Sequence, residues 1–221
     1  MEETTCQLNV NISTQFIPTA FFARYVQHAH HHLHGLEDAN IKFDFPHINL
    51  GAGVINLARV QQVEQFLDSA KAEWFVNIDC DQTWEKDGIS KLIDTDEDII
   101  SGVVHAKQVP HTPNFYYWDE KNGKFIDWDQ EIPSSNFEVD AVGFGFVGIR
   151  RPVLEALYHK YGATLFDRQR LNKWNNIFFG EDVAFCYKAI ESGYRIVVNP
   201  NIKVYHLGYH EIGKEEYYKE M

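Results

Sequence analysis

Segments with strand character and segments with helix character alternate along most of this chain, and this alternation constrains the fold more than any other feature. The clearest strand is 74–78, a near-continuous apolar run of the kind found in central strands covered on both faces. It follows 54–70, which carries apolar residues at helical spacing, and it precedes a short helix at 88–93 and a strand at 98–104. Such alternation predicts an α/β fold, with a mixed, mostly parallel sheet flanked by helices in a single domain over 1–221.

The remaining segments continue the pattern. The other predicted strands are 7–12, 41–45, 141–149, 195–198 and 203–206, and the other predicted helices are 21–33, a helix opening at Arg151-Pro152, and 181–192. Within the irregular stretch 105–138, Asn122-Gly123 predicts a hairpin turn. Ligands of such sheets bind beyond the carboxyl ends of the strands, so the polar residues that follow apolar strands are the candidates for chemistry.

Composition excludes several classes of protein. The formal net charge of −12 argues against a nucleic-acid partner and against binding to anionic lipid. The three cysteines are scattered without a Cys-x-x-Cys pair, so they suggest neither a disulfide framework nor a thiolate zinc site, and a reducing compartment fits them best. The acidic start lacks the layout of a signal peptide, and no apolar run approaches the roughly 18 residues of a membrane span. We therefore expect a soluble cytoplasmic protein.

Two aspartates follow the clearest strand. Asp79 and Asp81 are two residues apart, and in an extended segment both side chains point the same way, so that they can converge on one hard cation. The alternative is an acidic turn or helix cap before Gln82.

Two further features come late in the chain. Glu181 and Asp182 are the first residues of a predicted helix. Carboxylates at this position either take part in binding or catalysis or only cap the helix. His206 ends the last apolar strand, and a lone histidine in such a place is more often a satisfied residue than a metal ligand.

Taken in order, these motifs resemble the GT-A class of nucleotide-sugar glycosyltransferases, most closely glycosyltransferase family 2 and its short soluble relatives. The resemblance covers 54–81, 141–157 and 180–208, and the last of these segments is the most specific. It implies a Rossmann-like GT-A fold in which 1–105 forms the nucleotide-binding half and 106–221 the acceptor-binding half.

The resemblance also implies roles for the site residues. Asp81 and His206 would hold Mn²⁺ or Mg²⁺, and Asp79 would either share this metal or reach the ribose of the donor. Asp182 would be the general base and Glu181 would hold the acceptor, a glycan or another hydroxyl-bearing molecule, in an inverting transfer from a UDP-sugar.

The nucleotide end of the site rests on weaker matches, each of which has an alternative as a turn, cap, bulge or surface residue. The candidates are Ser13 and Thr14 in the first loop, Asp44 for the uracil, Arg59 facing the phosphates or buttressing the base loop, Lys107 for a phosphate, and Gly143 and Gly145 where the backbone approaches the donor sugar.

Departures from the family pattern leave other functions open. The chain lacks the Gln-x-x-Arg-Trp motif of processive synthases, which favours a nonprocessive enzyme. Its first loop also lacks the Thr-x-Asn motif that is common in the family. A nonenzymatic nucleotide- or sugar-binding module and a metal-dependent hydrolase are alternatives. A sugar-nucleotide pyrophosphorylase fits less well because 13–18 lacks a Gly-rich basic loop.

Five histidines lie within 28–34. Four of them form two pairs on opposite flanks of a predicted helix, so we interpret the group as a solvated face.

Overall fold

The computed structural model describes residues 4–12, 41–50, 54–68, 72–79, 81–167, 179–207 and 211–212, with backbone alone for 4–12, 41–50 and 211–212. The strands are β1 (Thr4–Ile12), β2 (Ile41–Leu50), β3 (Trp74–Asp79), β4 (Gln82–Trp84), β5 (Ile99–Val103), β6 (Phe115–Asp119), β7 (Lys124–Asp127), β8 (Phe137–Val139), β9 (Ala141–Val142), β10 (Phe146–Arg150), β11 (Ile196–Leu207) and β12 (Glu211–Ile212). The helices are α2 (Ile55–Asp68), α3 (Gly88–Ile93), α4 (Arg151–Tyr161), the 3₁₀ helix η1 (Gly162–Thr164) and α5 (Glu181–Glu191).

The main sheet has the strand order β12-β11-β5-β10-β3-β1-β2, with β4 and β8 also paired to β11. β1 pairs in parallel with β2 and β3, β11 pairs in parallel with β5, and β10 is antiparallel to both β3 and β5. It follows that β1, β2, β3, β5 and β11 all run in one direction and end at the same edge of the sheet. This is the mixed, mostly parallel sheet that the sequence predicts.

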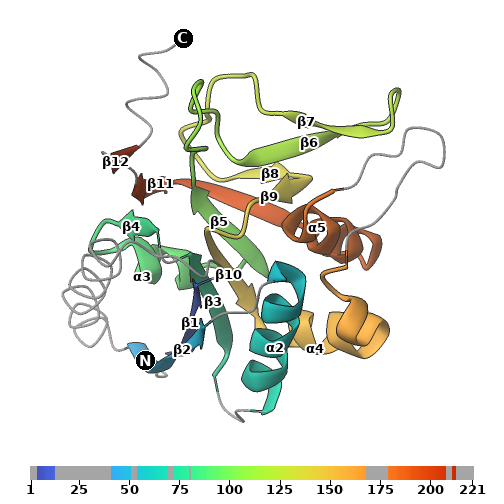
Figure 1. Ribbon diagram of the computed structural model, residues 1–221. Coiled ribbons are helices and arrows are strands. Elements are labelled where there is room, and N and C mark those ends of the chain that lie inside the picture. The colour runs from blue at the N-terminus through green and yellow to red at the C-terminus, as the bar shows by residue number, and fades with distance from the viewer. Residues whose placement is uncertain are drawn as a thin grey trace.

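Helices cover the two faces of the sheet (Figure 1). Alternate residues of β10 show the division: Val147 joins a core that includes Phe66 of α2 and Leu154 of α4, whereas Gly148 lies against Leu92 of α3 on the other face. The side chains of Val147, Phe66, Leu154 and Leu92 are completely buried. Burial on both faces explains why β3, β5 and β10 are nearly continuous apolar runs.

A second sheet of three strands, ordered β7-β6-β9, lies above α5 in Figure 1. β6 and β7 form the hairpin predicted at Asn122-Gly123. Gly123 has φ of 60°, a left-handed conformation that glycine adopts without the steric penalty of a Cβ atom. The carboxylate of Asp119 accepts hydrogen bonds from the backbone N–H groups of Lys121 and Asn122 and so fixes the turn.

Several predicted strands differ from the structure in their bounds. The segments 195–198 and 203–206 are one strand, β11, whose pairing with β5 shifts register between Val198 and Lys203, so the irregular middle is a distortion within a single strand. β2 runs to Leu50, not to residue 45, and Pro46 is accommodated because β2 is an edge strand whose register with β1 also shifts.

The predicted helix 88–93 is confirmed as α3, and the helix at 54–70 is confirmed as the slightly shorter α2. The predicted helix 21–33 and its histidines lie outside the described residues. Over the part of the chain that the structure describes, no helix combines the length and the apolar character needed to cross a membrane.

Candidate active site

A buried arginine forms the base of the candidate site, at the carboxyl end of β3. Arg59 of α2 is 1 % exposed, and its guanidinium donates hydrogen bonds to Asn77 Oδ1 (2.6 Å) and Asp79 Oδ1 (3.1 Å). Its Nε lies 4.0 Å from Glu181 Oε1, and its charged group lies over the ring of Phe144, 5.4 Å from the centroid. One cation of α2 thus holds the end of β3 and the start of α5 together.

Asp81 and His206 come together because β4 pairs with β11. His206 lies opposite Gln82 in this antiparallel ladder, and the backbone N–H of Leu207 donates to the carbonyl of Asp81 at 2.7 Å. The imidazole Nε2 of His206 consequently lies 3.7 Å from Asp81 Oδ1. Asp81 belongs to the turn before β4, so the expectation that Asp79 and Asp81 lie on one extended segment is wrong.

The tautomer of His206 follows from its other hydrogen bond. Nδ1 contacts the backbone carbonyl of His105, and since a carbonyl can only accept, Nδ1 carries the proton. Burial lowers the pKa of His206, although the Asp81 carboxylate opposes this change, so the ring is neutral near pH 7. The Nε2 lone pair therefore faces Asp81, and a backbone carbonyl that orients the ring in this way is the usual support of a histidine metal ligand.

The three predicted metal ligands do not form one cluster. Asp79 Oδ1 accepts from Arg59, whereas Asp81 is shared between His206 and Lys107. Within the described residues, no group of three or more His, Cys, Asp and Glu side chains is placed to hold a metal ion. Asp81 and His206 nevertheless offer one carboxylate and one neutral imidazole, a donor set that fits a divalent cation.

Two carboxylates open α5, as the sequence predicts. Glu181 is buried and faces Arg59, whereas Asp182 is half-buried and accepts a hydrogen bond from the backbone N–H of Val183 at 2.8 Å. Burial and the neighbouring Glu181 raise the pKa of Asp182 to about 6. Gly180 makes room for this carboxylate, because a Cβ atom there would lie 2.6 Å from Asp182 Oδ1.

Negative charge exceeds positive charge in this group of side chains. Burial raises the pKa of Asp79 although Arg59 opposes the change, and Asp79 interacts electrostatically with both Asp81 and Asp182. The carboxylates of Asp79, Asp81, Glu181 and Asp182 together face the cations of Arg59 and Lys107. A further cation is therefore favoured at this edge of the sheet.

Gly143 and Gly145 lie between β9 and β10, and the structure gives both a packing role. A Cβ atom at Gly143 would lie 1.9 Å from Asn114 Nδ2, and one at Gly145 would lie 3.0 Å from Gln82 Nε2. The carbonyl of Gly145 also accepts from the backbone N–H of Asp79 at 3.0 Å. Contact of these glycines with a donor sugar stays a prediction.

The other predicted nucleotide residues have different outcomes. Ser13 and Thr14 lie outside the described residues, and Asp44 lies within β2, where it is paired with Gln7 of β1. Lys107 lies four residues beyond β5 and forms an ion pair with Asp81 Oδ2. Arg59 is too deeply buried to present its guanidinium to solvent.

Sequence reasoning missed two residues of the site. Asn77 is completely buried in β3, where it accepts from Arg59 and donates to the carbonyl of Phe144, and the signal was an asparagine within an apolar run. Tyr116 of β6 lies close enough to Asp182 to interact with its charge, and burial raises the pKa of Tyr116 to about 12. Its hydroxyl is therefore a neutral donor, and it is bonded to Asn114 Oδ1.

Comparison with solved structures identifies the fold. A197 from STIV aligns with 93 % of this chain and 86 % of its own, with a TM-score of 0.54 and 17 % identity. GalNAc-T7 with UDP, GalNAc and Mn²⁺ aligns with 93 % of this chain and 44 % of its own, with a TM-score of 0.52 and 12 % identity. The catalytic domain of Drosophila β1,4-galactosyltransferase 7 with xylobiose aligns with 90 % of this chain and 66 % of its own, with a TM-score of 0.52 and 15 % identity.

The chain spans less than half of the GalNAc-T7 structure and about two thirds of the galactosyltransferase domain. No protein-family model and no curated protein sequence matches it. The fold is GT-A-like, as the resemblance of the sequence predicts. At these identities the likeness concerns the fold, so function must be argued from the site.

Proposed function

We propose that this chain is a metal-dependent glycosyltransferase that transfers a sugar from a nucleotide-diphosphate sugar, a UDP-sugar, to an acceptor hydroxyl, with inversion and without processivity. The shared fold supports this proposal, since one protein of that fold is a galactosyltransferase and another is seen with UDP, GalNAc and Mn²⁺. The residues 1–105 would supply Arg59, Asp79 and Asp81, and 106–221 would supply Glu181, Asp182 and His206.

The observation that carries the proposal is the arrangement of Asp81 and His206. A carboxylate and a neutral imidazole face each other at 3.7 Å, at the edge where the parallel strands end, and the ring is oriented by the carbonyl of His105. These two residues would hold the cation, and their mixed oxygen and nitrogen donors favour Mn²⁺ over Mg²⁺. When bound, the cation neutralises negative charge on the departing diphosphate.

Asp182 would act as the general base. Its pKa of about 6 leaves it ionised at neutral pH yet more basic than an ordinary aspartate, and the residue as a whole is only half-buried. It would take the proton of the acceptor hydroxyl as the hydroxyl oxygen attacks the anomeric carbon and the nucleotide diphosphate leaves. Attack on the face opposite the leaving group inverts the configuration at that carbon.

Arg59 would act as a positioning residue. It sets the side chain of Asp79, which would reach the ribose, and it lies against Glu181, which would hold the acceptor. The backbone N–H of Val183 fixes the Asp182 carboxylate in the same first turn of α5. Asp182 and Glu181 are thus held in place by the first turn of α5, and Glu181 also lies against the buried Arg59.

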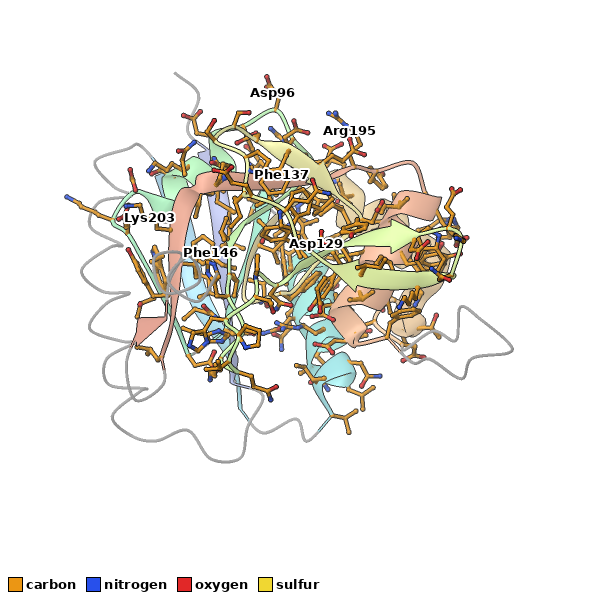
Figure 2. All side chains as sticks on the ribbon, turned by 90° about the horizontal axis from the view of Figure 1, so that it is seen from above. Asp96, Asp129, Phe137, Phe146, Arg195 and Lys203 are labelled. Atoms are coloured by element: carbon orange, nitrogen blue, oxygen red, sulfur yellow. The ribbon has the colours of Figure 1, made fainter. Side chains whose placement is uncertain are left out.

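The test is turnover of a panel of UDP-sugars, measured as released UDP with and without Mn²⁺ and with candidate glycan acceptors. We expect Mn²⁺-dependent release that is lost in Asp81→Ala and retained in Asp96→Ala, because Asp96 is exposed and lies at the margin of the molecule (Figure 2). Release that no acceptor stimulates would favour a hydrolase. UDP binding without turnover would favour a binding module, and either result would contradict transfer.

A further inference from the structure

Lys107 forms an ion pair inside the candidate metal site. Its ammonium contacts Asp81 Oδ2, while the other oxygen of the same carboxylate, Oδ1, faces His206 Nε2 at 3.7 Å. The side chain of Lys107 is 42 % exposed and that of Asp81 is 29 % exposed. The carboxylate that would hold a cation is therefore already neutralised on one side by the chain's own lysine.

The backbone on the amino side of Lys107 is held firmly. The N–H of Ala106 donates to the carbonyl of Thr112 at 2.9 Å, and the carbonyl of Ala106 is bonded to His111 Nδ1 at 3.0 Å. His105 pairs with Pro113 in an isolated β-bridge. We expect Lys107 to change partner by moving its side chain, because the backbone before it is held and its four-carbon stem is flexible.

A divalent cation bound by Asp81 and His206 would stand beside this ammonium, and the two positive charges would repel each other. Lys107 and the cation therefore compete for Asp81. The two phosphates of a nucleotide diphosphate offer the ammonium a new set of oxygen acceptors at the same place. Arg59, the other cation of the described site, is 1 % exposed and already bonded to Asn77 and Asp79, so it cannot follow.

We propose that Lys107 exchanges Asp81 for the diphosphate of the donor when the cation binds. Lys107 then opposes binding of the cation alone and favours binding of cation and nucleotide together, which makes the two ligands bind cooperatively. This inference rests on the proposed function, because it takes the nucleotide-diphosphate donor and the Asp81–His206 cation from it.

The experiment is a set of Mn²⁺ and UDP titrations of the wild type and Lys107→Met, followed by calorimetry and by the electron paramagnetic resonance signal of free Mn²⁺. Without UDP, Lys107→Met should bind Mn²⁺ about 2- to 5-fold more tightly, the range expected for loss of a competing surface ion pair. With Mn²⁺ present, the same variant should bind UDP about 10-fold more weakly, since a charge-assisted bond to phosphate is lost. In the variant, Mn²⁺ should increase the affinity for UDP less than in the wild type, and UDP should increase the affinity for Mn²⁺ less. Because the coupling is reciprocal, these two decreases should be equal.

Lys203→Met is the matched control. Lys203 of β11 also forms a surface ion pair, with Glu85 at 3.3 Å, and its side chain is 46 % exposed. This variant should leave both affinities unchanged, because its ion pair does not involve Asp81 or His206.

Unchanged or weaker binding of Mn²⁺ to Lys107→Met without UDP would overturn the exchange, and so would unchanged binding of UDP. In either case, UDP binding by the wild type that requires Mn²⁺ would leave the proposed function standing. Failure of the wild type to bind Mn²⁺ and UDP together would instead remove the proposed function and the exchange with it.

Discussion

Replacing Arg59 with methionine removes the cation that joins the two halves of the candidate site. Methionine keeps much of the apolar stem but supplies neither charge nor hydrogen-bond donors. Asp79 and Glu181, whose side chains are only 30 % and 11 % exposed, would lose their shared cation, and Asn77 Oδ1 would lose its donor. A carboxylate left in such a place without a counter-charge destabilises the folded state.

The size of the effect follows from this burial. Removing one partner of a buried ion pair costs about 3–5 kcal/mol, and the partial exposure of Asp79 places the expected loss near the lower end, at about 3 kcal/mol. In a domain of this size each kcal/mol lowers the Tm by about 2–4 °C, so we expect a decrease of about 6–12 °C.

The assay is thermal and urea denaturation followed by circular dichroism, with Arg195→Met as the matched control. Arg195 also forms an ion pair, with Glu97 at 3.0 Å, but its side chain is 64 % exposed and lies at the margin of the molecule (Figure 2). The control should change the free energy of unfolding by less than about 0.5 kcal/mol. Equal stability losses in the two variants would refute the reasoning, because burial of the Arg59 network would then contribute nothing.

Three further predictions concern catalysis and the metal. Asp182→Asn should bind UDP as the wild type does but lose about 10²- to 10⁴-fold in kcat, since only the proton acceptor is removed; unchanged turnover would exclude Asp182 as the base. In the wild type, kcat should rise with pH through about 6 and level off above it, because the pKa of Asp182 is raised to about 6 and only the ionised carboxylate accepts a proton. A kcat that stays constant between pH 5 and pH 7, measured as sugar transferred in quenched time points, would contradict this assignment. His206→Ala should weaken Mn²⁺ binding in the presence of UDP by at least about 10-fold, and an unaltered calorimetric titration would count against its role as a ligand.

Much of the fold could be predicted from the sequence because the sheet is buried on both faces. The apolar runs at β3 and β5 and the helical spacing of α2 are direct consequences of that burial. The bounds of β2 and β11 were predicted wrongly, because the proline within β2 and the irregular middle of β11 resemble strand ends. Pairing with neighbouring strands, which no local pattern contains, decides that these strands continue.

The location of a site residue could be predicted from the sequence where the residue stands at the end of a strand or at the start of a helix. Asp79, Lys107 and His206 follow or end parallel strands, and Glu181 and Asp182 open α5, so the topology brings them to one edge. The partners of Arg59 were not predictable, because its contacts with Asn77 and Asp79 join residues 18 and 20 positions away across a helix and a strand. The sharing of one ion by Asp79 and Asp81 stays a prediction, and the structure adds that Asp79 Oδ1 already accepts a hydrogen bond from Arg59.

We propose that Asp81 and His206 hold a divalent cation at the edge of the sheet where a nucleotide diphosphate binds. Anomalous diffraction at the manganese absorption edge, from crystals grown with Mn²⁺ and UDP, tests it most directly. We predict one strong anomalous peak in contact with an Asp81 oxygen, His206 Nε2 and the diphosphate of UDP. A structure with UDP bound and no anomalous peak at these two side chains would contradict the claim.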